Sequence, residues 1–314
     1  MDGNTFFFGF EPEFMAWLQK ILGDAGAAVA GVLTLFGEEL FLIAILGFIY
    51  WCYDKEFGKL IGVNIVTAVC LNPFIKNIFL RRRPYMDHLI VKCLKAVKPS
   101  ADIYDISAQG YSFPSGHSMN SACVFGTFAL EKKPKIFKII AFVLPLIVGF
   151  SRIALGVHYP TDVLVGWVVG AAVCLLLTRL QKKIKRRWIL HLCIFVPCLT
   201  GVFFCKTDDY YTALGVMAGL FVAIPFEEKF VNFKNTRSIP FCILRLIGGF
   251  GGYGILSVVL KLPFSEEFLT SGTSAAYMVR ACRYFIIVFL LIGLYPKVFG
   301  KVEGLLSKKK EVTT

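Results

Sequence analysis

The stretch DVLVGWVVGAAVCLLLTRL, residues 162–180, is apolar except for Asp162 at its start and Thr178 and Arg179 near its end. A helix that crosses a membrane needs about 20 mostly apolar residues, and this stretch has that length. Eight further runs of this kind occur at 28–50, 59–80, 117–131, 136–152, 188–204, 211–226, 239–260 and 283–300. The sequence therefore predicts an all-α fold, a polytopic membrane bundle of about nine transmembrane helices.

The composition of the whole chain favours the same interpretation. Of its 314 residues, 56% are hydrophobic and 18% are charged, whereas a soluble domain has roughly 45–50% apolar and about 25% charged residues. The cysteines form no CxxC pair, so neither a zinc ribbon nor a thioredoxin-like site is indicated. The net charge of +13 lies mostly in short clusters between apolar runs, and no basic face lies on a soluble domain. We therefore expect the bilayer as a partner and no nucleic acid.

Positive charge between the spans predicts the orientation. Basic side chains gather in the loops after the odd-numbered spans, at Lys55 and within 132–135, 182–187, 229–237 and 308–310. Because cytoplasmic loops carry the excess of lysine and arginine, we expect the N-terminus outside and the C-terminus in the cytoplasm. The loops at 81–116, 153–161, 205–210 and 261–282 then face outward or toward a lumen.

Three short segments at the outward ends of spans hold unusual polar residues. The first is KNIFLRRRP, from Lys76 to Pro84. Lys76 and Arg83 are seven residues apart, so they share a helix face, and Pro84 stops the helix. The arginines could simply reach lipid headgroups, but Lys76 lies more than a turn deeper than Arg81, and a buried cation is costly unless it has a use.

The second segment is PSGH, from Pro114 to His117, which leads directly into an apolar run. Ser115 is a good N-cap, and Gly116 lets an anion approach the backbone. The free N–H groups at a helix start form an anion site, which His117 in the first turn can also reach. The alternative is an ordinary cap with a histidine at the interface.

The third segment is SRIALGVHYPTD, from Ser151 to Asp162. Arg152 ends one span, and Pro160 stands in the first turn of the next, where proline is tolerated. From that turn Asp162 can reach back to one nitrogen of His158, which would fix the tautomer and leave the other nitrogen free to attack. The alternative is a structural His–Asp contact that closes a loop. Together the segments bring three cations, a helix start and two histidines to one membrane face, a set suited to phosphoryl transfer.

These segments resemble the three signature motifs of the type 2 phosphatidic acid phosphatase family, whose site is related to that of vanadium haloperoxidases. The patterns are K-x6-RP, PSGH and SR-x5-H-x3-D, matched by Lys76, Arg83 and Pro84, by Pro114 to His117, and by Ser151, Arg152, His158 and Asp162. The resemblance covers about residues 40 to 180. We expect three parts in the chain: an interfacial segment at 1–27, in which 11–22 looks like an amphipathic helix, a catalytic bundle at 28–180, and additional helices at 181–314.

The resemblance also implies roles for these residues. His158 attacks phosphorus and forms a phosphohistidine, Asp162 orients it, and His117 protonates the leaving oxygen and then assists water. The phosphoryl oxygens are held by Lys76, Arg83, Arg152, Ser115 and the Gly116 backbone. No metal and no other cofactor is implied, which fits the absence of a carboxylate cluster near these residues in the sequence.

The substrate remains open at this stage. A site at the ends of membrane spans favours a lipid monoester or pyrophosphate: phosphatidic acid, phosphatidylglycerol phosphate, a polyprenyl pyrophosphate or a sphingoid-base phosphate. The layout is also similar to that of glucose-6-phosphatase, so a soluble ester such as glucose 6-phosphate is an alternative. The extra C-terminal spans suggest a transporter or lipid flippase as a third reading, although no pair of broken helices supports it. The loop pattern fits a bacterial plasma membrane with the site outside, or an endoplasmic reticulum membrane with the site facing the lumen.

Two acids, Glu38 and Glu39, fall inside the first apolar run. Acids within a membrane are costly and are usually paired or functional. We predict that one of them pairs with a cation near the site, such as Arg82 or Lys76. The alternative is that the span begins later and both acids lie near the interface.

Overall fold

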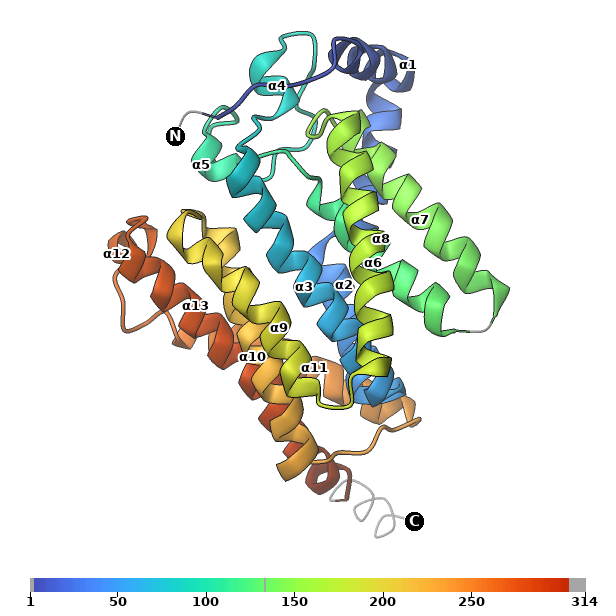
Figure 1. Ribbon diagram of the computed structural model, residues 1–314, viewed down its shortest axis with the longest axis vertical. Coiled ribbons are helices and arrows are strands. Elements are labelled where there is room, and N and C mark those ends of the chain that lie inside the picture. The colour runs from blue at the N-terminus through green and yellow to red at the C-terminus, as the bar shows by residue number, and fades with distance from the viewer. Residues whose placement is uncertain (1–2, 133, 305–314) are drawn as a thin grey trace.

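The computed structural model of the chain describes residues 3–132 and 134–304. Across these residues the regular elements are helices. One isolated β-bridge pairs Asn4 with Arg81. Figure 1 shows the long helices packed side by side as a bundle. The all-α membrane fold is therefore confirmed. Lys133 and Lys308–Lys310, on which part of the orientation prediction rests, lie outside the described residues.

Seven helical stretches are long and apolar enough to cross a membrane. They are α1 (Phe10–Leu33) with the turn that follows it, α3 (Lys55–Phe79), α7 (Lys135–Ala154), α8 (Pro160–Lys183), α10 (Asp208–Phe230), α11 (Ile239–Val259) and the helical stretch that begins with α13 (Ser274–Val288). Shorter helices are α2 (Glu39–Phe48), α6 (Gly116–Glu131) and α9 (Arg187–Leu199), with the small α4 (Pro84–Asp87), α5 (Ile106–Gln109) and α12 (Glu266–Thr270). The count of nine spans and their orientation stay predictions.

The predicted first span, 28–50, is not one helix. α1 continues to Leu33, a 3-10 turn covers Thr34–Gly37, and Glu38 is extended (ψ 143°) before α2 begins. The break lies where the chain approaches α7, because a Cβ added to Gly37 would lie 2.6 Å from Val148 Cγ1. Close packing of this kind does not change the hydropathy of the sequence, so residues 28–50 were predicted as one continuous helix.

The amphipathic helix expected at 11–22 is the first part of α1. It lies across one end of the bundle in Figure 1, and the chain then bends at Gly23 (φ 56°) and descends along the other helices. The same end holds α4 and α5, on the long segment between α3 and α6.

The central helix of the bundle is α3. One side packs against α6 and α8 through a cluster that includes Ala68, Met119 and Val173. The other side packs against α10 through a cluster that includes Val66 and Leu214. α3 therefore joins the part of the chain that holds the three motifs to the C-terminal helices.

Two helix ends and two helix starts meet at the end of the bundle that holds α4 and α5. α3 ends at Phe79, α7 ends at Ala154, and α6 and α8 begin at Gly116 and Pro160. α6 and α8 approach closely there, because a Cβ added to Gly166 would lie 2.7 Å from the Ser115 carbonyl oxygen. The packing of these helices brings the three sequence segments together.

Candidate active site

Hydrogen bonds tie the second motif to the third motif and to α3. The Ser115 N–H donates to the carbonyl oxygen of Asp162 at 2.9 Å, which ties the start of α6 to the start of α8. From α3, the Asn72 side chain donates to the carbonyl oxygen of Pro114 at 3.0 Å. Asn72 was not predicted as a site residue, because it looks like an ordinary polar residue in an apolar run. It holds the PSGH segment against the helix that carries Lys76.

The start of α6 has the predicted cap. Ser115 is fully buried, and its Oγ accepts hydrogen bonds from the Ser118 N–H at 3.4 Å and from the Ser118 hydroxyl at 2.9 Å. A Cβ on Gly116 would lie 3.0 Å from Asn72 Oδ1, so glycine fits this tight position. His117 stands in the first turn, within electrostatic range of Arg152 and Lys76.

The His158–Asp162 contact is present in outline. His158 is 2% exposed, and its Nδ1 lies 3.5 Å from Asp162 Oδ2, somewhat beyond an ordinary hydrogen bond. The carboxylate itself is held firmly, since the Tyr159 N–H donates to Oδ2 at 2.8 Å and Arg81 Nη1 donates to Oδ1 at 2.7 Å. The carboxylate therefore faces the Nδ1 side of the imidazole, as the spacing of the third motif predicts.

The three motif cations have no carboxylate partner among the described residues. Arg83 is 2% exposed, and its guanidinium donates to the carbonyl oxygens of Gln109, Gly110 and Val157 at 2.9–3.0 Å. Arg152 is 3% exposed; its Nη1 donates to Thr34 Oγ1 at 3.0 Å, and its Nε has no partner. These contacts orient the guanidinium groups without neutralising them.

Lys76 completes this group from α3. It is half-buried, and in the described part of the chain its ammonium makes neither a hydrogen bond nor an ion pair. It lies within electrostatic range of Arg83 and Arg152. The site therefore holds three positive charges that the protein leaves uncompensated, an arrangement that is costly until an anion binds.

The other two arginines of the RRR run behave differently. Arg82 pairs with Asp87 at 2.7 Å. Arg81 is 1% exposed and pairs with both Asp162 at 2.7 Å and Glu11 at 3.1 Å. Neither Arg81 nor Glu11 was predicted to lie at the site.

Burial and neighbouring charges tune His158. Burial lowers its pKa well below the ordinary value of 6.5, and the positive charges of Arg83, Arg152 and Lys76 lower it further. The imidazole is therefore neutral at pH 7, which leaves a nitrogen lone pair available. Burial also lowers the pKa of Arg83, which nevertheless stays a cation at neutral pH.

The prediction for Glu38 named the wrong partner. Glu38 pairs with Lys95 at 2.8 Å, whereas Arg82 pairs with Asp87 and Lys76 stays unpaired. The extended backbone at Glu38 turns its carboxylate toward the segment between α4 and α5 instead of toward α3. Glu39 makes no ion pair with a described residue.

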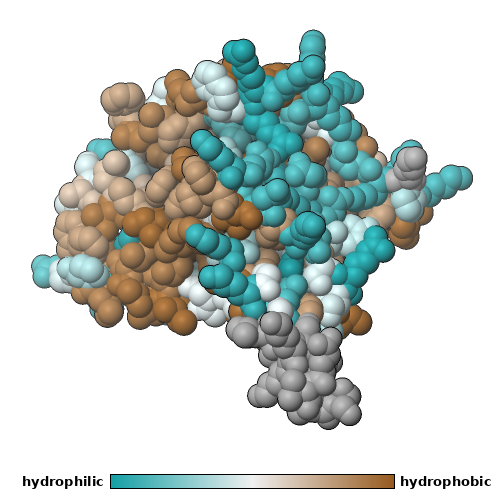
Figure 2. Space-filling model, turned by 90° about the horizontal axis from the view of Figure 1, so that it is seen from below, coloured by the Kyte–Doolittle hydropathy of each residue, from teal (hydrophilic) through white to brown (hydrophobic). Residues whose placement is uncertain are grey.

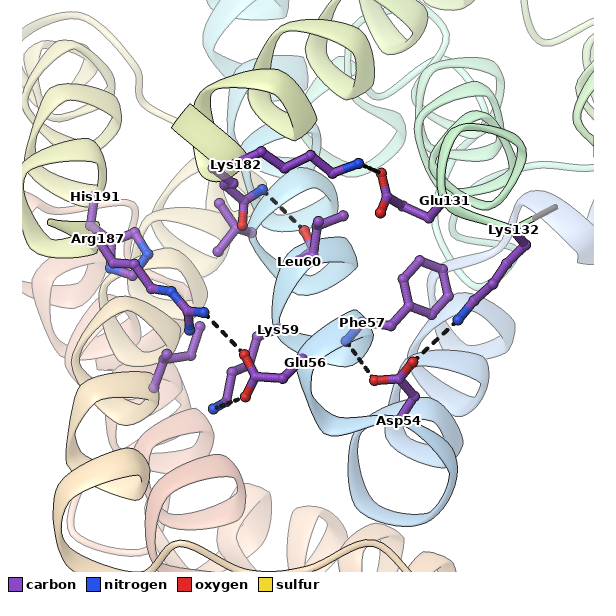
Figure 3. A pocket seen from close by; sticks show the side chains of 13 residues that line it. Asp54, Glu56, Phe57, Lys59, Leu60, Glu131, Lys132, Lys182, Arg187 and His191 are labelled. Carbon is purple, nitrogen blue, oxygen red and sulfur yellow. Dashed lines mark hydrogen bonds and ion pairs between the residues drawn. The ribbon is translucent and has the colours of Figure 1, made fainter. Parts of the chain in front are cut away.

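A polar cavity of about 420 Å³ lies at the opposite end of the bundle (Figure 3). Figure 2 looks onto that end, where hydrophilic side chains cover much of one half and apolar ones the rest. The cations of the cavity are neutralised in ion pairs: Lys59 with Glu56 and Glu228, Arg187 with the same two acids, Lys132 with Asp54, and Lys182 with Glu131. The cavity therefore lacks the uncompensated charge that distinguishes the motif end.

Within residues 3–132 and 134–304, no group of three or more His, Cys, Asp or Glu side chains could hold a metal ion. This observation does not test the mechanism, so metal independence stays a prediction.

Comparison with known proteins identifies the family. The PAP2 superfamily model matches residues 57–186, and a model described as PAP2 superfamily phosphatase, transmembrane extension, matches residues 211–309. Phosphatidylglycerophosphatase B of Bacillus subtilis is 35% identical over 183 residues, which are 54% of this chain and 78% of that protein. The chain belongs to the PAP2 superfamily. It is an integral membrane phosphatase, a phosphoric ester hydrolase, and the resemblance drawn from the three motifs is confirmed.

Other relatives match over similar lengths. Decaprenylphosphoryl-5-phosphoribose phosphatase of Mycobacterium tuberculosis is 29% identical and covers 52% of this chain and 86% of its own. Undecaprenyl-diphosphatase of Sulfolobus acidocaldarius is 26% identical over a match that covers 42% of this chain and 61% of that protein. The crystal structure of a transmembrane PAP2 type phosphatidylglycerolphosphate phosphatase from Bacillus subtilis is 29% identical, covers 55% of this chain and 87% of that one, and has a TM-score of 0.42.

Proposed function

We propose that this PAP2 phosphatase hydrolyses the phosphate monoester or pyrophosphate of a lipid, through a phosphohistidine on His158 and without a metal. One observation carries the proposal: Lys76, Arg83 and Arg152 gather beside a neutral His158 and have no carboxylate partner among the described residues. Buried charges are normally paired, because an unpaired ion loses several kcal/mol of hydration. A phosphoryl group brings the missing negative charge and spreads it over three oxygens.

In the first step the lone pair of His158 Nε2 attacks phosphorus. A nitrogen–phosphorus bond forms, the bond from phosphorus to the lipid oxygen breaks, and His117 gives its proton to that leaving oxygen. In the second step His117 takes a proton from water, the water oxygen bonds to phosphorus, and the nitrogen–phosphorus bond breaks. Inorganic phosphate leaves, and both histidines return to their starting states.

The surrounding groups act on charge and orientation. The three cations and the Gly116 N–H at the start of α6 face the equatorial oxygens, whose charge changes along the reaction. Asp162 holds the Nδ1 side of His158, so that Nε2 points at phosphorus, and it stabilises the positive charge that the imidazole gains.

Three observations support a lipid substrate. The site lies at the ends of α3, α6 and α8, where a headgroup can enter while its tail stays among the helices. An apolar groove of about 390 Å³, lined by residues such as Ala122, Pro145 and Trp167, runs along α6, α7 and α8 below the site. The relatives are also named for lipid phosphates or lipid pyrophosphates.

We place the site on the outer face of a bacterial plasma membrane. Lys59, Lys132, Lys182 and Arg187 lie at the opposite end of the bundle, which the positive-inside rule assigns to the cytoplasm. The similarity to a Bacillus phosphatase is consistent with this location.

The test is phosphate release by purified protein in detergent with EDTA, from phosphatidylglycerophosphate, undecaprenyl diphosphate, phosphatidic acid and glucose 6-phosphate. Wild type is compared with His158→Ala. We expect release from at least one lipid that survives EDTA and is lost in the variant. Release from glucose 6-phosphate alone would overturn the lipid assignment, and release that EDTA abolishes would overturn metal independence.

A further inference from the structure

Arg81 is a buried cation beside the site that has two carboxylate partners. Its Nη1 lies 2.7 Å from Asp162 Oδ1, and its Nη2 lies 3.1 Å from Glu11 Oε2. All three side chains are 1% exposed or less. The guanidinium also lies over the Tyr159 ring, 3.9 Å from its centroid, and over the Phe6 ring at 4.6 Å. This packing leaves Arg81 one orientation.

Glu11 is fixed as closely as the arginine that it contacts. Its Oε1 accepts hydrogen bonds from the Thr161 N–H at 2.9 Å and from the Thr161 hydroxyl at 2.7 Å. Its Oε2 also accepts one from the Phe8 N–H at 2.9 Å. The first turn of α1 is therefore bonded to the residue immediately before Asp162.

We propose that Glu11 and Arg81 are positioning residues for the Asp162–His158 pair, so that the interfacial start of α1 forms part of the catalytic apparatus. This inference rests on the function proposed above. Arg81 holds Oδ1 of Asp162, which turns Oδ2 toward His158 Nδ1. Glu11 holds Arg81 from the other side.

The charges of the three groups explain why an acid stands behind the arginine. Arg81 alone would cancel the negative charge of Asp162 and weaken its attraction for the imidazolium that forms during catalysis. With Glu11 the group of three carries a net charge of about −1, from two carboxylates and one guanidinium. Arg81 can then orient Asp162 without removing the negative field at His158.

His158 is faced by charged or titratable groups from every neighbouring element. These are Lys76 on α3, Arg83 after α3, His117 on α6, Arg152 on α7 and Asp162 on α8. Four of these five groups are bases, and Asp162 is the one acid. The negative charge of Glu11, which lies behind Arg81, is therefore a large part of what favours the imidazolium form of His158.

The experiment compares Glu11→Gln and Arg81→Lys with wild type in detergent, with phosphatidylglycerophosphate as substrate, over a range of pH. Removal of the Glu11 charge disfavours the imidazolium, so the acidic limb of kcat/KM moves to lower pH by about half a unit or more. For this variant kcat falls about 10-fold with KM unchanged. Arg81→Lys keeps the charge but loses the fork that contacts both acids, so kcat falls about 100-fold and the limb stays in place.

Arg82→Lys is the matched control, because Arg82 is the neighbouring arginine and pairs with Asp87 away from the two histidines. It should keep wild-type kinetics. A limb that does not move in Glu11→Gln, together with wild-type kcat in Arg81→Lys, would overturn the inference. His158→Ala in the same series separates the two claims, since an active His158→Ala refutes the histidine mechanism itself, whatever Glu11 does. If Glu11→Gln fails to fold, Arg81→Lys still tests the inference, because a positioning role predicts a fall in kcat with little change in KM.

Discussion

Arg152→Met should make the protein at least as stable as wild type while it abolishes most activity. The substitution removes a buried guanidinium that donates a hydrogen bond to Thr34 and has no carboxylate partner among the described residues. Loss of that bond costs about 1.5–3 kcal/mol, whereas relief of an uncompensated buried ion returns several kcal/mol. We expect the free energy of unfolding to rise by about 1 kcal/mol. Activity should fall about 10²–10³-fold, the effect of one lost donor to transition-state charge.

Arg81→Met is the matched control for this prediction. Arg81 is equally buried, but it pairs with Glu11 and Asp162. Removal of one partner from a buried ion pair costs about 3–5 kcal/mol, since the remaining charges are left alone. The two arginine-to-methionine variants should therefore differ by about 4 kcal/mol or more in stability, with opposite signs.

Stability can be followed with a thiol-reactive fluorophore, because Cys70, Cys123 and Cys198 are buried and free and become reactive on unfolding. Inorganic orthovanadate supplies the missing anion. At about 100 times its dissociation constant it should stabilise wild type by about 2.7 kcal/mol and Arg152→Met by much less. Equal destabilisation of the two variants, or equal stabilisation by orthovanadate of wild type and Arg152→Met, would refute the reasoning.

Three further expectations follow from the site. Asn72→Ala removes the 3.0 Å hydrogen bond that holds Pro114. Because a small loss of alignment slows catalysis, kcat should fall about 10-fold while the melting temperature changes little. A wild-type kcat would count against this role. Because burial and the neighbouring cations hold the pKa of His158 below 6.5, the nucleophile stays neutral at pH 7 and is lost only as pH falls further. The acidic limb of kcat/KM, corrected for the ionisation of the substrate, should therefore lie below pH 6.5, and a limb above that pH would contradict the assignment. Glu38→Gln breaks a pair with Lys95 in which both side chains are about a third exposed; solvent screening limits the loss to less than about 1 kcal/mol, and a large loss of activity would show that the pair does more than hold the outer segment.

The bundle and its reaction could be read from the sequence because both leave local signals. Apolar runs of spanning length predict membrane helices wherever they occur. The start of α6 at Gly116 was predictable from its Ser115 cap, and the contact of His158 with Asp162 from their spacing across a helix start. Each of these features depends on residues that are close in the chain.

What the sequence did not reveal depends on packing between distant segments. Arg81 and Arg82 are adjacent and chemically identical, yet one is buried against Asp162 and the other pairs with Asp87. The residue before them, Leu80, ends α3 with a left-handed backbone (φ 53°), and nothing in the sequence marks that residue. Glu11 lies at the start of the predicted amphipathic helix, and nothing near it in the chain indicates its partner Arg81, which is 70 residues away.

The central claim is tested most directly by isolation of the phosphoenzyme. His117→Ala slows both steps that His117 assists, but the leaving oxygen of an activated aryl phosphate such as 2,4-dinitrophenyl phosphate needs no proton. With that ester only the attack of water is slowed and the intermediate accumulates, so the variant is mixed with it in EDTA, quenched in alkali and analysed by peptide mass spectrometry. The account predicts one phosphoryl group on the peptide that contains His158, and none when His158→Ala is added to the same protein. A phosphoryl group on another residue, or rapid phosphate release by the double variant, would contradict it.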